Sequence, residues 1–380
     1  MAKLTGIVNN TSMVNFMSQL AADNNAVNLA NDFSDFACPD GLLDVLISHI
    51  REGHNKYAPS EGIAELRNVI SAYIKEFSGY TYDPETEVTV TAGATQAIFT
   101  AISSIVREGD EVIVFEPAYE TYIPAIESKG ARPVFIQLKA NDFSIDWSNV
   151  QKMITTRTKL IILSTPHNLS GAVLTDEDFD KLQKIVNGTK IMILSDESFG
   201  DLYHNPADKR SIACYPKLAE RAVVVGSLSK SLCVPGWKIG YCLAPAAISA
   251  EVRIAHSYQV YSVNLPMQYA MADYVGGRTA LFPYLEQINT CKALFASLMA
   301  DSSYTLSPTS GGYFQVLGYE KISTERDVDF VKRLAKDYGV TAMPMSVFYH
   351  DSIDNKQLRV CIGKTEEEIR LAAERLKKVK

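Results

Sequence analysis

A single lysine stands where an apolar run ends in small polar residues. Residues 223–225 are all valine and predict a buried strand, and Ser227 and Ser229 lead directly to Lys230. A lysine at the mouth of a strand is partly removed from water, which lowers its pKa and makes its amine a usable nucleophile. Ser227, Ser229 and Lys238 could hold an anionic group such as phosphate. On this stretch alone, an ordinary surface lysine after a strand is an equal alternative.

An acidic residue follows a second apolar run, at Asp196. Residues 191–194 predict a buried strand, so this carboxylate would be partly buried and would need a cationic partner. The protonated ring nitrogen of pyridoxal phosphate would meet that need, with Lys230 as the lysine that forms a Schiff base with its aldehyde. The alternative for Asp196 is an N-cap for the segment that follows.

Other predicted strand ends carry residues that suit a flat, phosphorylated ligand. Gly93, Ala94 and Thr95 lie between a strand and a helix, where backbone N–H groups and the helix dipole favour an anion. Tyr119 could stack on a heterocycle, and the amide of Asn168 offers both a donor and an acceptor. Each signal has an ordinary alternative, namely a helix cap for the glycine turn and plain packing for the tyrosine.

The elements that would position these residues form an alternating α/β pattern between residues 87 and 245. A parallel sheet is expected, and ligands of such sheets bind beyond the carboxyl ends of the strands. Helices are expected at 41–51, 63–76 and 95–107 in the first half, and at 281–300, 327–338 and 365–378 near the C-terminus. The predicted strands of the sheet are residues 87–91, 111–115, 132–137, 159–163, 190–194, 222–225 and 238–242.

Composition narrows the class of protein. The chain has 380 residues, 47% of them hydrophobic, and its net charge of −7 gives no basic footprint for nucleic acid. The six cysteines are scattered without metal-type spacing, which predicts a reducing, cytoplasmic location and no metal site. The N-terminus lacks the apolar core of a signal peptide, and no apolar run reaches membrane-spanning length.

Taken together, the ordered motifs resemble those of a known family. They are the stretches 55–59, 89–95, 110–113, 165–168, 195–197, 229–230 and 236–241. The chain resembles the class I/II aminotransferases, pyridoxal-phosphate enzymes of fold type I, and most resembles their methionine and kynurenine/glutamine aminotransferase branch. The resemblance implies a large domain with a mostly parallel seven-stranded sheet sandwiched by helices, plus a smaller α+β domain. Expected boundaries are 46–275 for the large domain and 276–380 for the small one, which residues 1–45 would join.

The resemblance also implies roles for the residues described above. Lys230 would be the Schiff-base lysine and proton shuttle, and Asp196 would pair with the ring nitrogen. Asn168 would bind the ring hydroxyl, and Tyr119 would stack on the ring. The phosphate would be bound by residues from several turns, with one tyrosine reaching it from the other subunit of a homodimer: Gly93, Ala94, Thr95, Ser227, Ser229, Lys238 and Tyr57.

Arg359 matches the family's carboxylate-binding arginine, and Asn168, Asp32 and Phe33 would complete the substrate site. Two positions depart from the family pattern. Phe199 stands at a cofactor-binding position where relatives usually carry tyrosine, so one hydrogen bond to the ring is missing. Asp32 stands where a glycine is expected, and its carboxylate would repel acidic ligands or select a basic or small side chain.

The expected activity is transfer of an amino group from a neutral, methionine-like or aromatic amino acid to a 2-oxo acid. Two alternatives stay open. Phe199 and Asp32 leave room for a carbon–sulfur β-lyase that uses the same cofactor, and the other alternative is a protein that binds the cofactor with little turnover.

Overall fold

The computed structural model describes residues 7–8 and 11–379. Its largest sheet has seven strands, as predicted, and they lie in the order β4-β10-β9-β8-β7-β5-β6. All are parallel except β10, which runs antiparallel to both β4 and β9. The strands in sheet order are β4 (Val88–Thr91), β10 (Gly240–Leu243), β9 (Ala222–Gly226), β8 (Met192–Asp196), β7 (Thr158–Ser164), β5 (Glu111–Glu116) and β6 (Arg132–Gln137).

The central strands are buried on both faces. Val112 and Val114 of β5 pack into one apolar core, and Ile113 between them packs into the other. In β7, Ile162 packs into the same core as Val112 and Val114, and Ile161 packs into the other. Successive side chains of a strand point to opposite faces, so a strand buried on both sides is a nearly continuous apolar run. These strands therefore lack the polar alternation of a half-exposed sheet.

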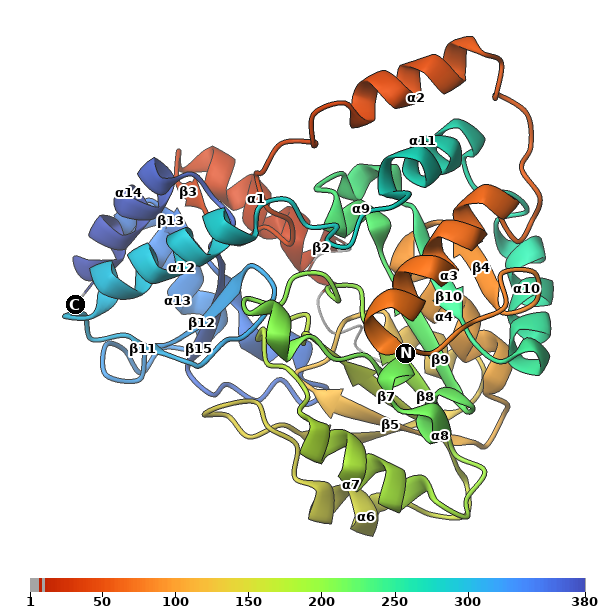
Figure 1. Cartoon of the computed structure of the whole chain (residues 1–380). Helices are drawn as coiled ribbons and strands as arrows, with labels where there is room; N and C mark the ends of the chain where they lie inside the picture. Colours follow the sequence, from red (N-terminus) through yellow and green to blue (C-terminus); the bar gives the residue numbers. More distant parts are fainter. Residues whose placement is uncertain (1–6, 9–10, 380) are drawn as a thin grey trace.

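Helices cover both faces of this sheet, which together with them forms the large lobe (Figure 1). One face packs against α4 (Gly93–Ile105), α5 (Tyr122–Glu127) and α10 (Ala246–Gln259). The other face packs against α3 (Ala64–Ser78), α6 (Trp147–Met153), α7 (Asp176–Val186), α8 (Pro216–Ala219) and α11 (Leu265–Val275). Across the part of the chain that the structure describes, no helix combines the length and the apolar character needed to cross a membrane.

A second sheet forms the small lobe. Its strands are antiparallel and lie in the order β11 (Thr305–Leu306), β12 (Phe314–Gly318), β15 (Gln357–Cys361) and β14 (Met343–Pro344). The accompanying helices are α12 (Leu285–Met299), α13 (Asp327–Arg333), which continues as a π-helical turn over Leu334–Tyr338, and α14 (Glu366–Lys377). The N-terminal segment joins this lobe, because β3 (Val27–Asn28) pairs in parallel with β13 (Val340–Thr341) and α1 (Met13–Asp23) contacts β13. The domain boundaries at residues 45 and 275 stay a prediction.

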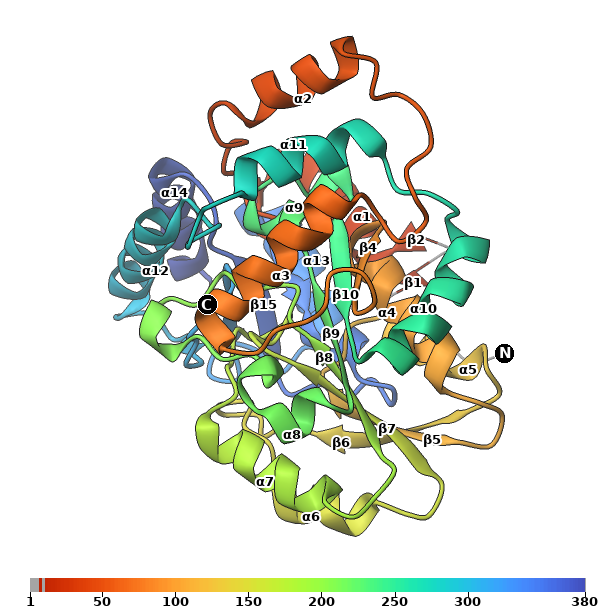
Figure 2. The same ribbon diagram turned by 45° about the vertical axis from the view of Figure 1, so that its right-hand side comes forward.

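Helix α2 (Leu42–Arg51) lies apart from both sheets and packs along α11, in both views of the molecule (Figures 1 and 2). His49 fastens the two helices, since its Nε2 is 2.8 Å from a carboxylate oxygen of Asp273. The rings of His49 and His54 both stack on Tyr269. The opposite side of α2 exposes Leu43, Ile47 and Ile50.

Candidate functional site

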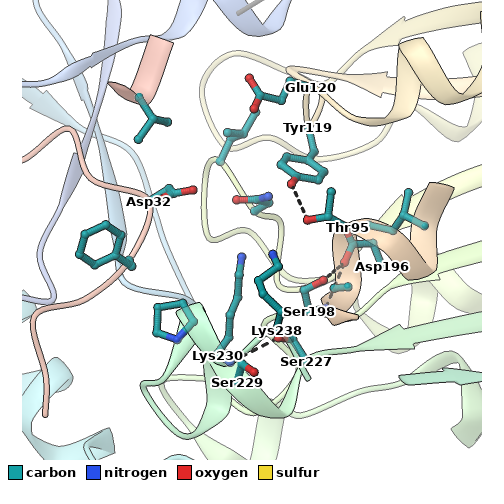
Figure 3. A pocket seen from close by; sticks show the side chains of 18 of the residues that line it. Asp32, Thr95, Tyr119, Glu120, Asp196, Ser198, Ser227, Ser229, Lys230 and Lys238 are labelled. Carbon is teal, nitrogen blue, oxygen red and sulfur yellow. Dashed lines mark hydrogen bonds between the residues drawn. The ribbon is translucent and has the colours of Figure 1, made fainter. Parts of the chain in front are cut away.

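One cavity between the two lobes gathers most of the predicted site residues (Figure 3). The large lobe supplies its floor and one wall, and the N-terminal segment and small lobe supply Asp32, Phe33, Phe348 and Arg359. The predicted residues that line the cavity are Asp32, Phe33, Gly93, Ala94, Thr95, Tyr119, Asn168, Asp196, Ser227, Ser229, Lys230, Lys238 and Arg359.

Lys230 projects into this cavity from α9 (Leu228–Ser231), the short helix that follows β9. Ser227 caps α9, and its hydroxyl accepts a hydrogen bond from the backbone N–H of Lys230 at 3.3 Å. Burial lowers the pKa of Lys230 to about 8, although the carboxylates of Asp32 and Asp196 oppose that shift. The Nζ atom lies 3.8 Å from the centre of the Phe199 ring. The amine is thus a much better nucleophile at neutral pH than an ordinary lysine.

Asp196 ends β8 at the carboxyl edge of the sheet and is 2% exposed. One carboxylate oxygen accepts hydrogen bonds from the backbone N–H and the hydroxyl of Ser198. The other accepts a hydrogen bond from the Tyr122 hydroxyl at 2.6 Å. No ion pair to Asp196 is found within residues 7–8 and 11–379. Hydrogen-bond donors thus hold the carboxylate in place, and the cavity is where a cationic partner would reach it.

The start of α4 and the side chain of Lys238 form a positively charged corner. α4 begins at Gly93, and a Cβ atom added there would lie 3.1 Å from Cε and 3.4 Å from Nζ of Lys238. Lys238 itself adopts a left-handed backbone conformation, with φ of 54°. An ammonium group beside the positive end of a helix is unfavourable unless an anion lies between them. This corner is therefore suited to a phosphate.

The remaining predicted cofactor residues surround that corner and the two charged groups. The hydroxyls of Thr95 and Tyr119 are 3.0 Å apart. The backbone N–H of Asn168 donates to the Ser164 hydroxyl at 3.2 Å, which fixes the loop after β7. Ser229 differs from the others, because its hydroxyl already donates to the carbonyl of Ile239 and accepts from the N–H of the same residue. Its hydroxyl therefore ties α9 to the start of β10.

Arg359 extends from β15 into the cavity and is 3% exposed. Its guanidinium lies 4.1 Å from the ring centre of Phe314 and 5.7 Å from that of Phe348. The buried Nη2 atom has no hydrogen-bond partner among the described residues. Burial lowers the pKa of Arg359, and Asp32 is the strongest of the negative charges that oppose the shift. A buried, unpaired guanidinium indicates an anionic ligand such as a carboxylate.

Two predicted residues do not line the cavity of their own chain. Tyr57 is 81% exposed, and its ring contacts Tyr261 edge to face at 5.3 Å. Phe199 is buried under Lys230 and packs edge to face against Tyr313. It therefore lies beneath the lysine rather than on the surface of the cavity.

The sequence reasoning assigned no role to Tyr122, Ser198, Glu120 or Phe348. The first two bind Asp196, and the last two line the cavity. Ser198 could have been found, since a serine two residues after an aspartate commonly closes a local hydrogen-bonded turn. The position of Phe348 depends on how the small lobe docks, for which the sequence holds no local signal.

Comparison with known proteins identifies the family. The family model "Aminotransferase class I and II" matches residues 25–376. The chain is 38% identical over 370 residues to a methionine aminotransferase of Escherichia coli, covering 97% of this chain and 96% of that protein. It is 28% identical over 399 residues to the human kynurenine–oxoglutarate transaminase 1, covering 95% and 94% of the two chains.

A solved structure supports the same assignment. The crystal structure of an Escherichia coli protein with methionine aminotransferase function superposes with a TM-score of 0.94 at 37% identity, covering 98% of this chain and 100% of that one. The fold, the charged cavity and the sequence thus lead to one conclusion, and the chain belongs to the class I and II aminotransferase family.

Proposed function

We propose that this pyridoxal-phosphate-dependent aminotransferase moves an amino group from a neutral, methionine-like or aromatic amino acid to a 2-oxo acid. The observation that carries the proposal is the unpartnered, buried Nη2 atom of Arg359, in the same cavity as Lys230 and Asp196. The apolar side chains of Val14, Ile98, Leu169 and Phe348 also line this cavity and suit an uncharged substrate side chain. The 38% identity to a methionine aminotransferase supports the same class of donor.

The residues present fit pyridoxal phosphate. Lys230 would hold it covalently, and Asp196, a buried carboxylate without a cation, would face its ring nitrogen. The start of α4 and Lys238 would hold its phosphate, because this corner places a helix N-terminus beside an ammonium group. When bound, the cofactor supplies an electron sink that makes the proton on the substrate Cα acidic enough to remove.

The protein's own groups then position the substrate and move one proton. Arg359 would bind the substrate α-carboxylate through two parallel hydrogen bonds, which fixes the orientation of Cα. Lys230 Nζ would accept the proton from Cα and return it to the carbon that receives it. A pKa of about 8 suits this amine to both directions of transfer near neutral pH.

A donor panel tests this proposal. Holoenzyme is mixed with one amino acid at a time, and the absorbance of the bound cofactor and the release of 2-oxo acid are followed. We expect methionine and phenylalanine to convert the cofactor and to release a stoichiometric amount of 2-oxo acid. A spectral change without product would instead favour a low-turnover binding protein, and no change with any donor would contradict the proposal.

The β-lyase alternative is tested in the same assay with cystathionine. A lyase would release ammonia and pyruvate without a 2-oxo acid acceptor. The relatives described above are all named as aminotransferases and give no support to a lyase.

We further propose a homodimer in which Tyr57 contacts the phosphate in the other subunit. Exposed apolar side chains lie on α2, on α10 and just after α10, and one of them, Tyr261, contacts Tyr57: Leu43, Ile47, Ile50, Ile254, Tyr258 and Tyr261. Hybrid dimers of Lys230→Ala and Tyr57→Phe subunits test the arrangement. If Tyr57 acts across the interface, each hybrid has one wild-type site and regains activity. If Tyr57 serves its own subunit, the hybrid has no intact site and mixing restores nothing.

We also propose a cytoplasmic location, on the scattered pattern of the six cysteines. Immunodetection in separated cell fractions tests it, and recovery outside the cytoplasmic fraction would contradict it.

A further inference from the structure

Two carboxylates line the cavity together with Arg359 and have no cation of their own. Asp32 comes from the N-terminal segment, and Glu120 comes from the loop before α5 (Figure 3). Within residues 7–8 and 11–379, neither carboxylate forms an ion pair or accepts a hydrogen bond. Asp35, three residues after Asp32, is by contrast paired with Lys364 at 2.5 Å. Because both residues line the cavity and no ion pair neutralises either charge within these residues, both can act on a molecule that occupies it.

The backbone holds Asp32 in a fixed relation to Arg359. The hydroxyl of Tyr313 donates to the carbonyl of Asp32 at 3.0 Å. On either side, the N–H of Cys361 donates to the carbonyl of Leu29 at 2.7 Å, and the N–H of Asp35 donates to the carbonyl of Gly363 at 2.9 Å. Residues 29–35 are thus bonded along the strand that carries Arg359, and the backbone at Asp32 cannot move away from β15 without breaking these contacts.

Glu120 is held from the large lobe. It lies next to Tyr119, whose hydroxyl is 3.0 Å from that of Thr95, and two residues before Tyr122, which binds Asp196. Burial raises the pKa of Glu120, Asp32 raises it further, and Arg359 opposes the shift. The two carboxylates therefore act on each other and on the same guanidinium.

The other two cations that line the cavity would bind the cofactor. Lys238 lies over the start of α4, and Lys230 stands between Asp196 and Asp32. When a substrate α-carboxylate occupies Arg359, no cation that lines the cavity is left for a second carboxylate. A dicarboxylic substrate would meet Asp32 or the partly buried Glu120 instead, and like charges placed close together repel.

We propose that Asp32 and Glu120 exclude substrates with a negatively charged side chain, so that both the amino donor and the 2-oxo acid acceptor carry a neutral or positively charged side chain. This inference rests on the proposed aminotransferase function. It adds that the physiological acceptor is a monocarboxylic 2-oxo acid and that 2-oxoglutarate is a poor one.

Isosteric pairs of substrates test the proposal. We expect kcat/KM for the wild-type holoenzyme to favour glutamine over glutamate by about 10²-fold. A similar ratio is expected between 2-oxo-4-methylthiobutanoate and 2-oxoglutarate as acceptors. The Asp32→Asn and Glu120→Gln variants should each reduce both ratios, and the double variant should bring them within about tenfold. The kcat/KM of lysine relative to that of its apolar counterpart norleucine should fall in the same variants, because they remove negative charge that would attract the lysine side chain.

Binding of unreactive acids gives a readout that is independent of turnover. Calorimetry with hexanoate and glutarate should show that wild-type holoenzyme prefers the monocarboxylate and that the double variant loses this preference. Asp44→Asn and Glu127→Gln remove exposed carboxylates outside the cavity and should change neither ratio. Equal use of glutamate and glutamine by an active wild-type enzyme would overturn this inference and leave the proposed function intact. Failure with every donor would instead count against the function itself.

Discussion

At Lys230, burial and the nearby carboxylates shift the pKa of the amine in opposite directions. Removal from water lowers the pKa of the amine, while Asp32 and Asp196 raise it, and the balance lies at about 8. An amine with that pKa is partly neutral at physiological pH, whereas an exposed lysine is almost wholly protonated. The type of residue and its place at a strand end predicted a reactive lysine. The contribution of Asp32 needed the fold, because that residue lies almost two hundred positions earlier in the chain.

The first prediction concerns uptake of the cofactor by the apoenzyme. Only the neutral amine of Lys230 can attack an aldehyde, so the rate of uptake should rise about tenfold per pH unit and level off above pH 8. Asp32→Asn should move the plateau to lower pH, because it removes a charge that raises the pKa of Lys230. Stopped-flow absorbance measures the rate, and Asp44→Asn is the control. An unchanged profile in Asp32→Asn would contradict this account.

The second prediction concerns Ser198, which donates to the Asp196 carboxylate. Ser198→Ala keeps the backbone hydrogen bond and loses the hydroxyl. A hydrogen bond to a charged group contributes about 1.5–3 kcal/mol, so kcat should fall at least about tenfold while KM for the donor changes little. Tyr122→Phe should have a similar effect, and Ser257→Ala, on α10 and outside the cavity, should have none. Steady-state kinetics and the pH dependence of the cofactor absorbance measure these effects.

At the scale of elements, the site depends on where strands end. The sequence predicted all seven strands of the large sheet within about two residues, because apolar runs bounded by polar residues locate buried strands well. It did not predict that β10 runs against its neighbours. Direction is decided by the path of the connection, and the turn after Lys230 returns the chain without a crossover helix. That reversal brings Lys238 back to the start of α4.

The third prediction tests this close approach. A Cβ atom on Gly240 would lie 2.7 Å from the backbone carbon of Gly93 and 2.8 Å from the nitrogen of Ala94. Gly240→Ala should therefore push the start of α4 away from β10 and raise the dissociation constant of pyridoxal phosphate about tenfold, in line with an overpacking cost of 1–3 kcal/mol. Gly236→Ala is the matched control, because its Cβ would meet no atom within 4 Å. Equal cofactor affinity in the two variants would contradict the prediction.

At the scale of the whole molecule, one buried acid links folding to pH. Glu197 accepts hydrogen bonds from Ser195 and from the N–H of Ile212, yet burial raises its pKa from 4.5 to about 7. Below pH 4.5 the group is protonated in the folded and the unfolded chain alike. Between pH 4.5 and 7 only the folded chain keeps the proton, so the free energy of unfolding falls as the pH rises.

The fourth prediction follows from that shift. The stability that Glu197 contributes at low pH should decline by about 3 kcal/mol between pH 4.5 and pH 8, and Glu197→Gln should abolish this part of the pH dependence. Urea unfolding of both apoproteins across this pH range measures the difference. The variant should gain stability relative to the wild type as the pH rises, and parallel curves would contradict the assignment to Glu197.

How the small lobe docks on the large lobe is the feature of the structure that the sequence predicts least. The resemblance to a family supplied Arg359 and Asp32 as members of the site, and the structure places both in one cavity. Glu120 and Phe348 were missed, because their roles depend on how the small lobe meets the large one. Tyr57 stays a prediction, since its proposed partner lies in a second copy of the chain.

The hydrogen bonds between residues 29–35 and β15 determine which residues move together if the two lobes move. Asp32 and Arg359 belong to one rigid piece, while Lys230 and Asp196 belong to the other lobe. Any hinge motion that carries the guanidinium toward the reacting lysine must carry the neighbouring carboxylate with it. The same movement that brings Arg359 to the α-carboxylate of a substrate therefore also brings the charge of Asp32 toward the substrate's side chain.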